Sequence, residues 1–222
     1  MHVSLVIVLF FVLLLMAILV YGMALKTKEN YIRILFIYLV VDFLMTVLSI
    51  CLVTLGGLDN NLFLFHLFTP VEYVIMCLLF NSILSDRRVK KIIRLSIPCF
   101  IALSIYFSVF IQKIRDNNSY ITIIESVLII CWTLLFLREV LLLKQVTVLH
   151  RYPLFWISVG ILFYFTETLV IEGLLDYMIK HSMELARRTY RISFIFKYLL
   201  FLSLTAGAYY RIGTKKLAEN QG

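Results

Sequence analysis

Six ionisable side chains interrupt the apolar segments of this 222-residue chain, and they are the residues best able to do chemistry. They are Asp42, Glu72, Glu125, Glu167, Glu172 and Lys197. A charged side chain at the centre of a bilayer costs about 2.5–3.5 kcal/mol on insertion scales, so such residues usually face the interior of a helix bundle. Inside a bundle, carboxylates and a lysine can bind a polar ligand, carry a proton or hold two helices together.

Helical spacing places most of these groups on polar faces, because residues three and four apart share one side of a helix. The faces comprise His66, Thr69, Glu72, Tyr73 and Met76; Trp156, Gly160, Tyr164 and Glu167; Tyr190, Ser193 and Lys197; and Tyr38, Asp42, Thr46 and Ser49. At about 1.5 Å per residue, Glu72 lies roughly 15 Å from the outer end of its segment, and Lys197 and Glu167 lie about 10–12 Å from theirs. These groups are therefore expected to meet at one level.

We expect them to form a ligand-binding pocket that opens to the outer side of the membrane. Its residues are predicted to be Glu72, Lys197, Glu167, Tyr73, Tyr164, Asp42 and His66. Glu72 would anchor a polar group of the ligand, Lys197 and Glu167 would set the charge, and Tyr73 and Tyr164 would line the pocket. Two alternatives stay open for Lys197, namely a structural pair with one acid and a side chain that reaches the interface. His66 is the least favoured of these site residues, because a histidine at this position can also lie at the level of the lipid headgroups. Glu125 and Glu172 are expected at the membrane interface.

The residue inventory offers no familiar catalytic or metal site. The four histidines form no HxxxH or HExxH pair, and the sequence has no GxSxG and no glycine-rich phosphate loop. Lys197 in the last apolar segment invites comparison with retinal proteins, but no acidic residue precedes it by one helical turn. We expect no metal, no cofactor and no catalytic residue, although a membrane enzyme acting on lipid remains a third, weaker alternative.

The composition identifies lipid as the solvent. Hydrophobic residues make up 62% of the chain and the mean hydropathy is +0.97, which is more apolar surface than one small globule can bury. The net charge of +8 comes from Lys and Arg clusters between apolar segments, so anionic headgroups rather than nucleic acid are the expected partner. The cysteines, Cys51, Cys77, Cys99 and Cys131, lie in apolar segments without a CxxC and are expected to be free.

Seven segments are long enough to cross a bilayer as helices. They are 3–25, 31–55, 62–84, 92–111, 119–143, 152–174 and 189–212. Short polar loops join them, which favours antiparallel packing of neighbours. The prediction is an all-α integral membrane bundle of seven transmembrane helices, with one domain at 1–212 and a short cytoplasmic tail at 213–222.

The distribution of basic residues predicts the orientation, because cytoplasmic loops are enriched in Lys and Arg. With the N-terminus out and the C-terminus in, the cytoplasmic side holds Lys26, Lys28, Arg33, Arg87, Arg88, Lys90, Lys91, Arg94, Arg138, Lys144, Arg151, Arg211, Lys215 and Lys216. The outer side holds only Lys113, Arg115, Lys180, Arg187, Arg188 and Arg191. The first segment has no preceding positive charge and is expected to be an uncleaved span rather than a signal peptide.

Two stretches resemble a known group of proteins. FHLFTPVEYVIMCLLF and YPLFWISVGILFYFTETLV are similar to small uncharacterised bacterial seven-span membrane proteins and to the membrane input region of some sensor histidine kinases. The resemblance lies in His66, Thr69, Pro70, Glu72, Tyr73, Trp156, Gly160 and Tyr164. It implies a bacterial inner-membrane location and, since no kinase domain follows, a separate signalling partner.

These observations favour a non-enzymatic sensor or receptor-like module that binds a small or lipophilic ligand in an outer-facing intramembrane pocket. The rival class is a proton- or ion-coupled carrier of a small solute that uses the same carboxylates. The three prolines, eight glycines, odd number of segments and absence of a visible repeat weigh against the carrier.

Overall fold

The computed structural model describes residues 2–57, 60–112, 114, 116–142 and 152–219, and within these ranges the chain is helical, without strands. Its α-helices are α1 (His2–Ala24), α2 (Asn30–Thr54), α3 (Phe63–Ile83), α4 (Arg87–Tyr106), α5 (Ser119–Leu142), α6 (Pro153–His181) and α7 (Met183–Glu219). A 3-10 turn at Leu25–Thr27 follows α1, and a π-helical turn at Phe107–Ile111 extends α4. Seven helices of the described residues are long and apolar enough to cross a membrane, which confirms the predicted helix-bundle class.

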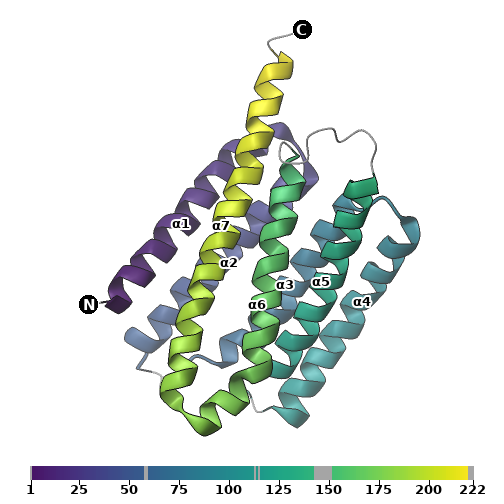
Figure 1. Ribbon diagram of the computed structural model, residues 1–222. Helices are drawn as coiled ribbons and strands as arrows, with labels where there is room; N and C mark the ends of the chain where they lie inside the picture. The colour runs from purple at the N-terminus through teal and green to yellow at the C-terminus, as the bar shows by residue number, and fades with distance from the viewer. Residues whose placement is uncertain (1, 58–59, 113, 115, 143–151, 220–222) are drawn as a thin grey trace.

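The helices pack as an up-and-down bundle in which consecutive helices run antiparallel (Figure 1). Neighbours around the bundle are α1, α2, α3, α5, α6 and α7, with α7 closing back against α1. Among the described segments, α4 packs chiefly on the outside of α3. The share of enclosed residues is accordingly greatest in α3 and smallest in α4.

Helix boundaries differ from the prediction mainly at α6 and α7. The predicted polar loop from 175 to 188 is wrong, because α6 continues to His181 and α7 begins at Met183. The polar residues whose burial is described there are exposed on a helical hairpin whose inner side is apolar; they are Lys180, His181, Ser182, Glu184, Arg187 and Arg188. That inner side is a separate small core of Ile171, Leu175, Met178 and Ala186.

Two other helix ends also extend past the predicted spans. Asp86 caps α4 by accepting a hydrogen bond from the Arg88 backbone N–H at 2.7 Å, so the basic stretch after it is helical rather than loop. At the other end of the chain, α7 runs to Glu219 and takes in most of the predicted tail. Residues 220–222 lie outside the described residues, as do Lys113, Arg115, Lys144 and Arg151 of the orientation argument.

Helices α6 and α7 approach each other closely. A Cβ on Gly207 would lie 2.7 Å from Ile157 Cγ1 and 2.9 Å from the Pro153 carbonyl oxygen, and one on Gly160 would lie 2.6 Å from Ser203 Cβ. Glycine at these two positions lets the helices approach closely, as small residues do in membrane bundles. This contact fixes the position of the α7 side chains that enter the bundle.

Large apolar side chains cover the lateral surface of the bundle. They include Leu5, Val12, Leu19, Leu44, Leu67, Leu95, Ile105, Leu134, Phe163 and Ile195. A water-soluble monomer rarely exposes a continuous apolar surface of this kind, whereas hydrocarbon is a suitable solvent for it. The fold therefore indicates an integral membrane protein. All four cysteines are free, as predicted.

Candidate functional site

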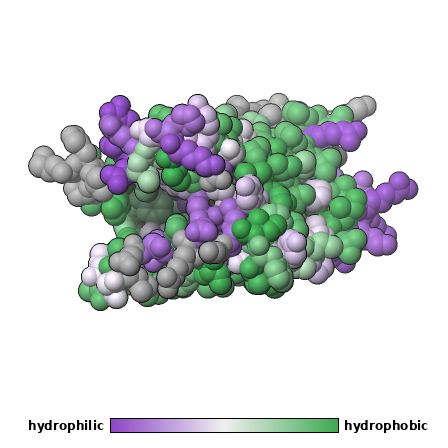
Figure 2. All heavy atoms as spheres, turned by 90° about the horizontal axis from the view of Figure 1, so that it is seen from below, coloured by the Kyte–Doolittle hydropathy of each residue, from purple (hydrophilic) through white to green (hydrophobic). Residues whose placement is uncertain are grey.

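A cavity of about 730 Å³ lies among the helices. Side chains of α1, α2, α3, α5, α6 and α7 line it, and none of its lining residues belongs to α4. It reaches from the middle of the bundle to the end at which α6 joins α7 and the N-terminus lies (Figure 1). Figure 2 looks onto this end and shows a recess between hydrophobic surfaces with hydrophilic side chains beside it.

Lys197 of α7 is the centre of a polar network at the deep end of the cavity. Its ammonium lies 3.2 Å from Asp42 Oδ1 of α2 and donates to the hydroxyls of Tyr38 and Tyr164, each at 3.4 Å. The same nitrogen lies 4.6 Å from the centroid of the Tyr164 ring, which adds a cation–π contact. One lysine thus ties together α2, α6 and α7.

Glu72 of α3 joins this network through a tyrosine. The Tyr38 hydroxyl donates to Glu72 Oε1 at 2.9 Å while it accepts from Lys197, so the hydroxyl links the ammonium to the carboxyl group. Both acids are almost fully enclosed, with 5% of Asp42 and of Glu72 exposed. Opposite charges and hydroxyl groups offset the cost of burying such groups.

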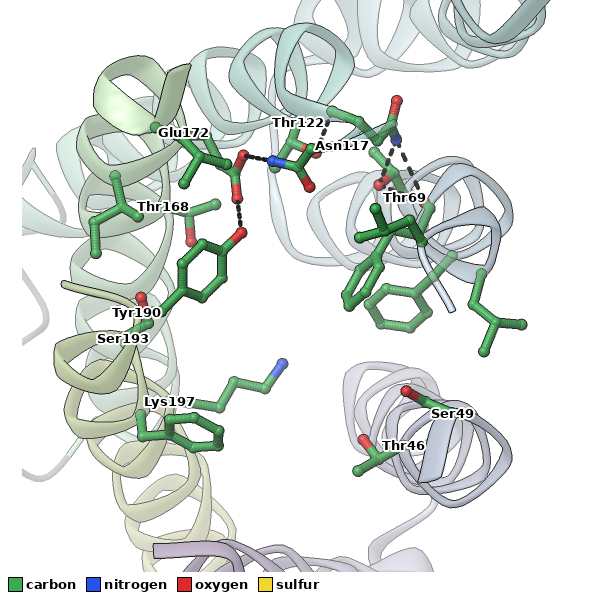
Figure 3. Close-up of a pocket in the computed structure, with 18 of the residues that line it drawn as sticks. Thr46, Ser49, Thr69, Asn117, Thr122, Thr168, Glu172, Tyr190, Ser193 and Lys197 are labelled. Carbon is green, nitrogen blue, oxygen red and sulfur yellow. Dashed lines mark hydrogen bonds between the residues drawn. The ribbon is translucent and has the colours of Figure 1, made fainter. Parts of the chain in front are cut away.

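A second group of polar side chains lies nearer the mouth (Figure 3). Glu172 accepts hydrogen bonds from the Tyr190 hydroxyl at 3.0 Å, the Asn117 amide at 3.0 Å and the Ser119 hydroxyl at 2.8 Å. Between the two levels, Ser193 donates to Glu167 at 2.6 Å. These bonds hold α5, α6 and α7 together at the entrance.

The remaining wall is largely apolar. It includes Phe10, Phe11, Met45, Ile50, Phe65, Phe68, Phe165, Ile171, Leu175 and Phe194. An apolar cavity with a few convergent polar groups is the usual form of a small-molecule site, and its volume falls in the range of about 300–1,000 Å³ typical of such sites. The arrangement suits an amphipathic molecule whose polar group reaches the deep end.

Five of the seven predicted site residues line this cavity. They are Asp42, Glu72, Tyr164, Glu167 and Lys197. Their positions therefore agree with the prediction that these groups meet inside one pocket. Lys197 contacts Asp42 directly, whereas it reaches Glu72 through Tyr38.

Tyr73 and His66 do not line the cavity. The Tyr73 hydroxyl donates to Ser96 Oγ at 2.7 Å, and the ring stacks on Phe100 of α4 with centroids 4.0 Å apart. His66 lies 2.8 Å from Ser108 Oγ and 3.1 Å from the Asp116 carbonyl oxygen. Each residue directly follows a cavity-lining residue of α3, and one step along a helix turns a side chain by about 100°. The assignment of both to the pocket is therefore wrong, because they face α4 and its connection to α5.

Glu125 was expected at the membrane interface, whereas the structure encloses it within the bundle. Only 1% of the residue is exposed, and it lines the cavity from α5. The sequence contained the signal, since Asn118, Thr122 and Glu125 follow helical spacing and all three line the cavity. Glu172, which is partly buried, also lines it, nearer the mouth.

A metal centre is not supported. Among the described residues, no group of three or more His, Cys, Asp or Glu side chains could hold a metal ion. His150 lies outside the described residues. In the comparisons with known proteins, no family model, curated protein or solved structure matches this chain.

Proposed function

We propose that this protein is a membrane-embedded, receptor-like module that binds a small amphipathic ligand in the cavity and passes the bound state to a partner protein. The cavity itself carries this proposal. Protein interiors are close-packed and contain few voids larger than a water molecule, so a chamber of about 730 Å³ in a 26.0 kDa bundle is space that a ligand would occupy.

The proposed orientation places the mouth of the cavity outside a bacterial inner membrane. Lys26, Lys28, Arg87, Arg88 and Arg211 belong to the end of the bundle opposite the mouth. The positive-inside rule assigns that end to the cytoplasm. A ligand would then enter from the outer side or from the outer leaflet.

Transmission to a partner would use α7. This helix carries Lys197 at the deep end of the cavity and projects beyond the other helices at the opposite end (Figure 1). A ligand that changes the packing around Lys197 would move a helix whose far end is accessible to another protein. Such signalling requires two packings of the bundle that the ligand binds unequally.

Native mass spectrometry of the purified protein tests the binding function. Wild type is compared with Thr46→Phe, which fills the cavity wall, with Glu72→Gln, and with Glu184→Gln, whose side chain lies on the exterior and pairs with Arg188. A small molecule retained by wild type and Glu184→Gln but lost from the other two folded variants supports the proposal. An empty wild type, together with no stabilisation by any added amphiphile, contradicts it.

A proton- or ion-coupled carrier is the second candidate function. Two buried carboxyl oxygens without hydrogen-bond partners favour it. Asp42 Oδ2 and Glu125 Oε1 are buried without a hydrogen-bond partner, so either carboxyl group has room for a proton. A carrier would move labelled solute across proteoliposomes with a pH dependence that Glu125→Gln removes. A receptor would bind the same solute without flux.

A further inference from the structure

The charges inside the cavity select the chemistry of its ligand. Among the described residues, five carboxyl groups line it, those of Asp42, Glu72, Glu125, Glu167 and Glu172. Two basic side chains from the same part of the chain accompany them, the deep Lys197 and Arg187, which is exposed near the mouth. The lining therefore has an excess of acidic groups, although the whole chain is basic.

Lys197 has no donor left for an anionic ligand. An ammonium group has three N–H donors. Asp42 Oδ1, the Tyr38 hydroxyl and the Tyr164 hydroxyl supply three acceptors within 3.4 Å of its nitrogen. A carboxylate or phosphate entering the cavity would have to displace one of these partners. It would also meet the unpaired acids around it.

Two acids of the cavity, Asp42 and Glu125, each have a buried carboxyl oxygen without a hydrogen-bond partner, but Asp42 is already paired with Lys197 through its other oxygen. Glu125 is therefore the better candidate to receive a donor from a ligand. The residue is 99% enclosed, and its Oε1 has no hydrogen-bond partner. The two hydroxyls near it along α5 are directed elsewhere, since Thr122 donates to the Asn118 carbonyl oxygen and Ser126 to that of Thr122. By contrast, Glu72, Glu167 and Glu172 each accept a bond from a side chain of the protein. A buried acceptor without a donor is costly, so Glu125 is a site at which a ligand donor would be strongly favoured.

The other walls fit a cation attached to a hydrophobic body. Six phenylalanines line the cavity, namely Phe10, Phe11, Phe65, Phe68, Phe165 and Phe194, and aromatic faces attract cations as well as apolar groups. In the described part of the chain the acids are too dispersed to form a metal-ion site. An organic ammonium, which needs one or two carboxylates, suits them better than a metal ion.

We propose that the ligand is an amphipathic organic cation, an amine on a hydrophobic body, whose ammonium group donates to Glu125 in the deep half of the cavity. This inference rests on the proposed ligand-binding function and specifies its chemical class. The body of the ligand would lie among the phenylalanines toward the mouth. The Lys197–Asp42 pair would remain intact beside it.

Three probes of equal chain length and different charge test the inference. Dodecylamine, dodecanol and dodecanoate are titrated into the full-length protein in lipid nanodiscs, and thermal stabilisation and binding isotherms are measured for each. Wild type is compared with Glu125→Gln, which keeps the shape of the side chain but removes its charge. Glu184→Gln is the control, because its carboxylate is exposed on the surface.

The expected result is that the amine binds wild type and Glu184→Gln more tightly than the alcohol or the acid does. The Glu125→Gln variant should bind the amine about tenfold or more weakly, because a charge-assisted hydrogen bond is lost. Thermal stabilisation of each variant is measured relative to the same variant without ligand. If Glu125→Gln fails to fold, the comparison of the amine, the alcohol and the acid on wild type tests the inference by itself.

Two results would overturn the inference. The first leaves the proposed ligand-binding function intact, and the second contradicts that function as well. If the alcohol or the acid binds wild type as tightly as the amine, the ligand is not a cation, while the binding function is retained. If none of the three probes binds wild type and Thr46→Phe is no less occupied in native mass spectrometry, both this inference and the proposed function are wrong.

Discussion

Lys197 compensates more buried negative charge than any other residue of the cavity. It pairs with Asp42 at 3.2 Å and reaches Glu72 through the Tyr38 hydroxyl, while only 12% of its side chain is exposed. Removing one member of a buried pair leaves the other uncompensated, which costs about 3–5 kcal/mol. We therefore predict that Lys197→Met lowers the free energy of unfolding by about that amount.

Asp42→Asn provides the test of this pairing. If Asp42 is the main partner, the double variant Lys197→Met with Asp42→Asn should recover a large part of the stability lost in Lys197→Met. The measurement is a double-mutant cycle by chemical unfolding in mild detergent. Additive losses in the double variant would show that the two side chains do not depend on each other.

Tyr38 and Tyr73 form a matched pair of tyrosines. Both are fully buried and each donates one hydrogen bond to a side chain, but Tyr38 serves Glu72 at the cavity and Tyr73 serves Ser96 away from it. We predict that Tyr38→Phe and Tyr73→Phe each cost about 1–3 kcal/mol of stability. Only Tyr38→Phe should also strengthen binding of an amine probe, since it leaves Glu72 Oε1 at the cavity without its donor. Isothermal titration of both variants checks this, and equal changes in affinity would contradict it.

The candidate residues could be found from helical spacing, but their partners could not. Spacing along one helix shows which side chains share a face, and it correctly grouped Asp42, Glu167 and Lys197 with their neighbours. It does not show how far a helix is turned in the bundle. A turn of one residue separates Glu72, which enters the cavity, from Tyr73, which faces α4. The burial of Glu125 likewise depends on which helix α5 faces.

At the scale of the helices, the packing of α6 against α7 depends on their close approach. Gly207 of α7 has the Pro153 carbonyl oxygen and Ile157 where a Cβ would be, whereas Gly173 of α6 has open space. We predict that Gly207→Ala destabilises the bundle by about 1–3 kcal/mol through overpacking. Gly173→Ala should be neutral or stabilising by up to about 1 kcal/mol, because alanine is the better helix former.

Unfolding of both glycine variants in the same detergent measures this difference. If Gly207→Ala is as stable as wild type, the two helices are free to separate and their contact does not fix the position of Lys197. A lower free energy of unfolding in both variants would instead indicate that the helices require the backbone flexibility of glycine rather than the space left by its missing side chain.

At the scale of the whole molecule, the hydrophobic pattern was sufficient for the class of the fold. Seven apolar segments of membrane length leave the backbone no alternative to helices in lipid. The same pattern could not show that α4 packs outside the ring formed by the other six helices, because every segment is apolar and lipid provides no contrast between inner and outer faces. It also concealed the α6–α7 hairpin, whose polar residues resemble those of a loop.

The orientation of the molecule leads to the last prediction. If the mouth of the cavity faces outward, Ser182 between α6 and α7 lies outside, and Ser85 between α3 and α4 lies in the cytoplasm; both are exposed. In a background with the four native cysteines replaced, a membrane-impermeant maleimide should label Ser182→Cys in intact cells. Ser85→Cys should be labelled only after the membrane is permeabilised. The reverse pattern would place the cavity mouth in the cytoplasm, and the ligand would then have to come from inside the cell. The basic residues of the α6–α7 hairpin make this a demanding test, because Lys180, Arg187 and Arg188 oppose the orientation that the other clusters favour.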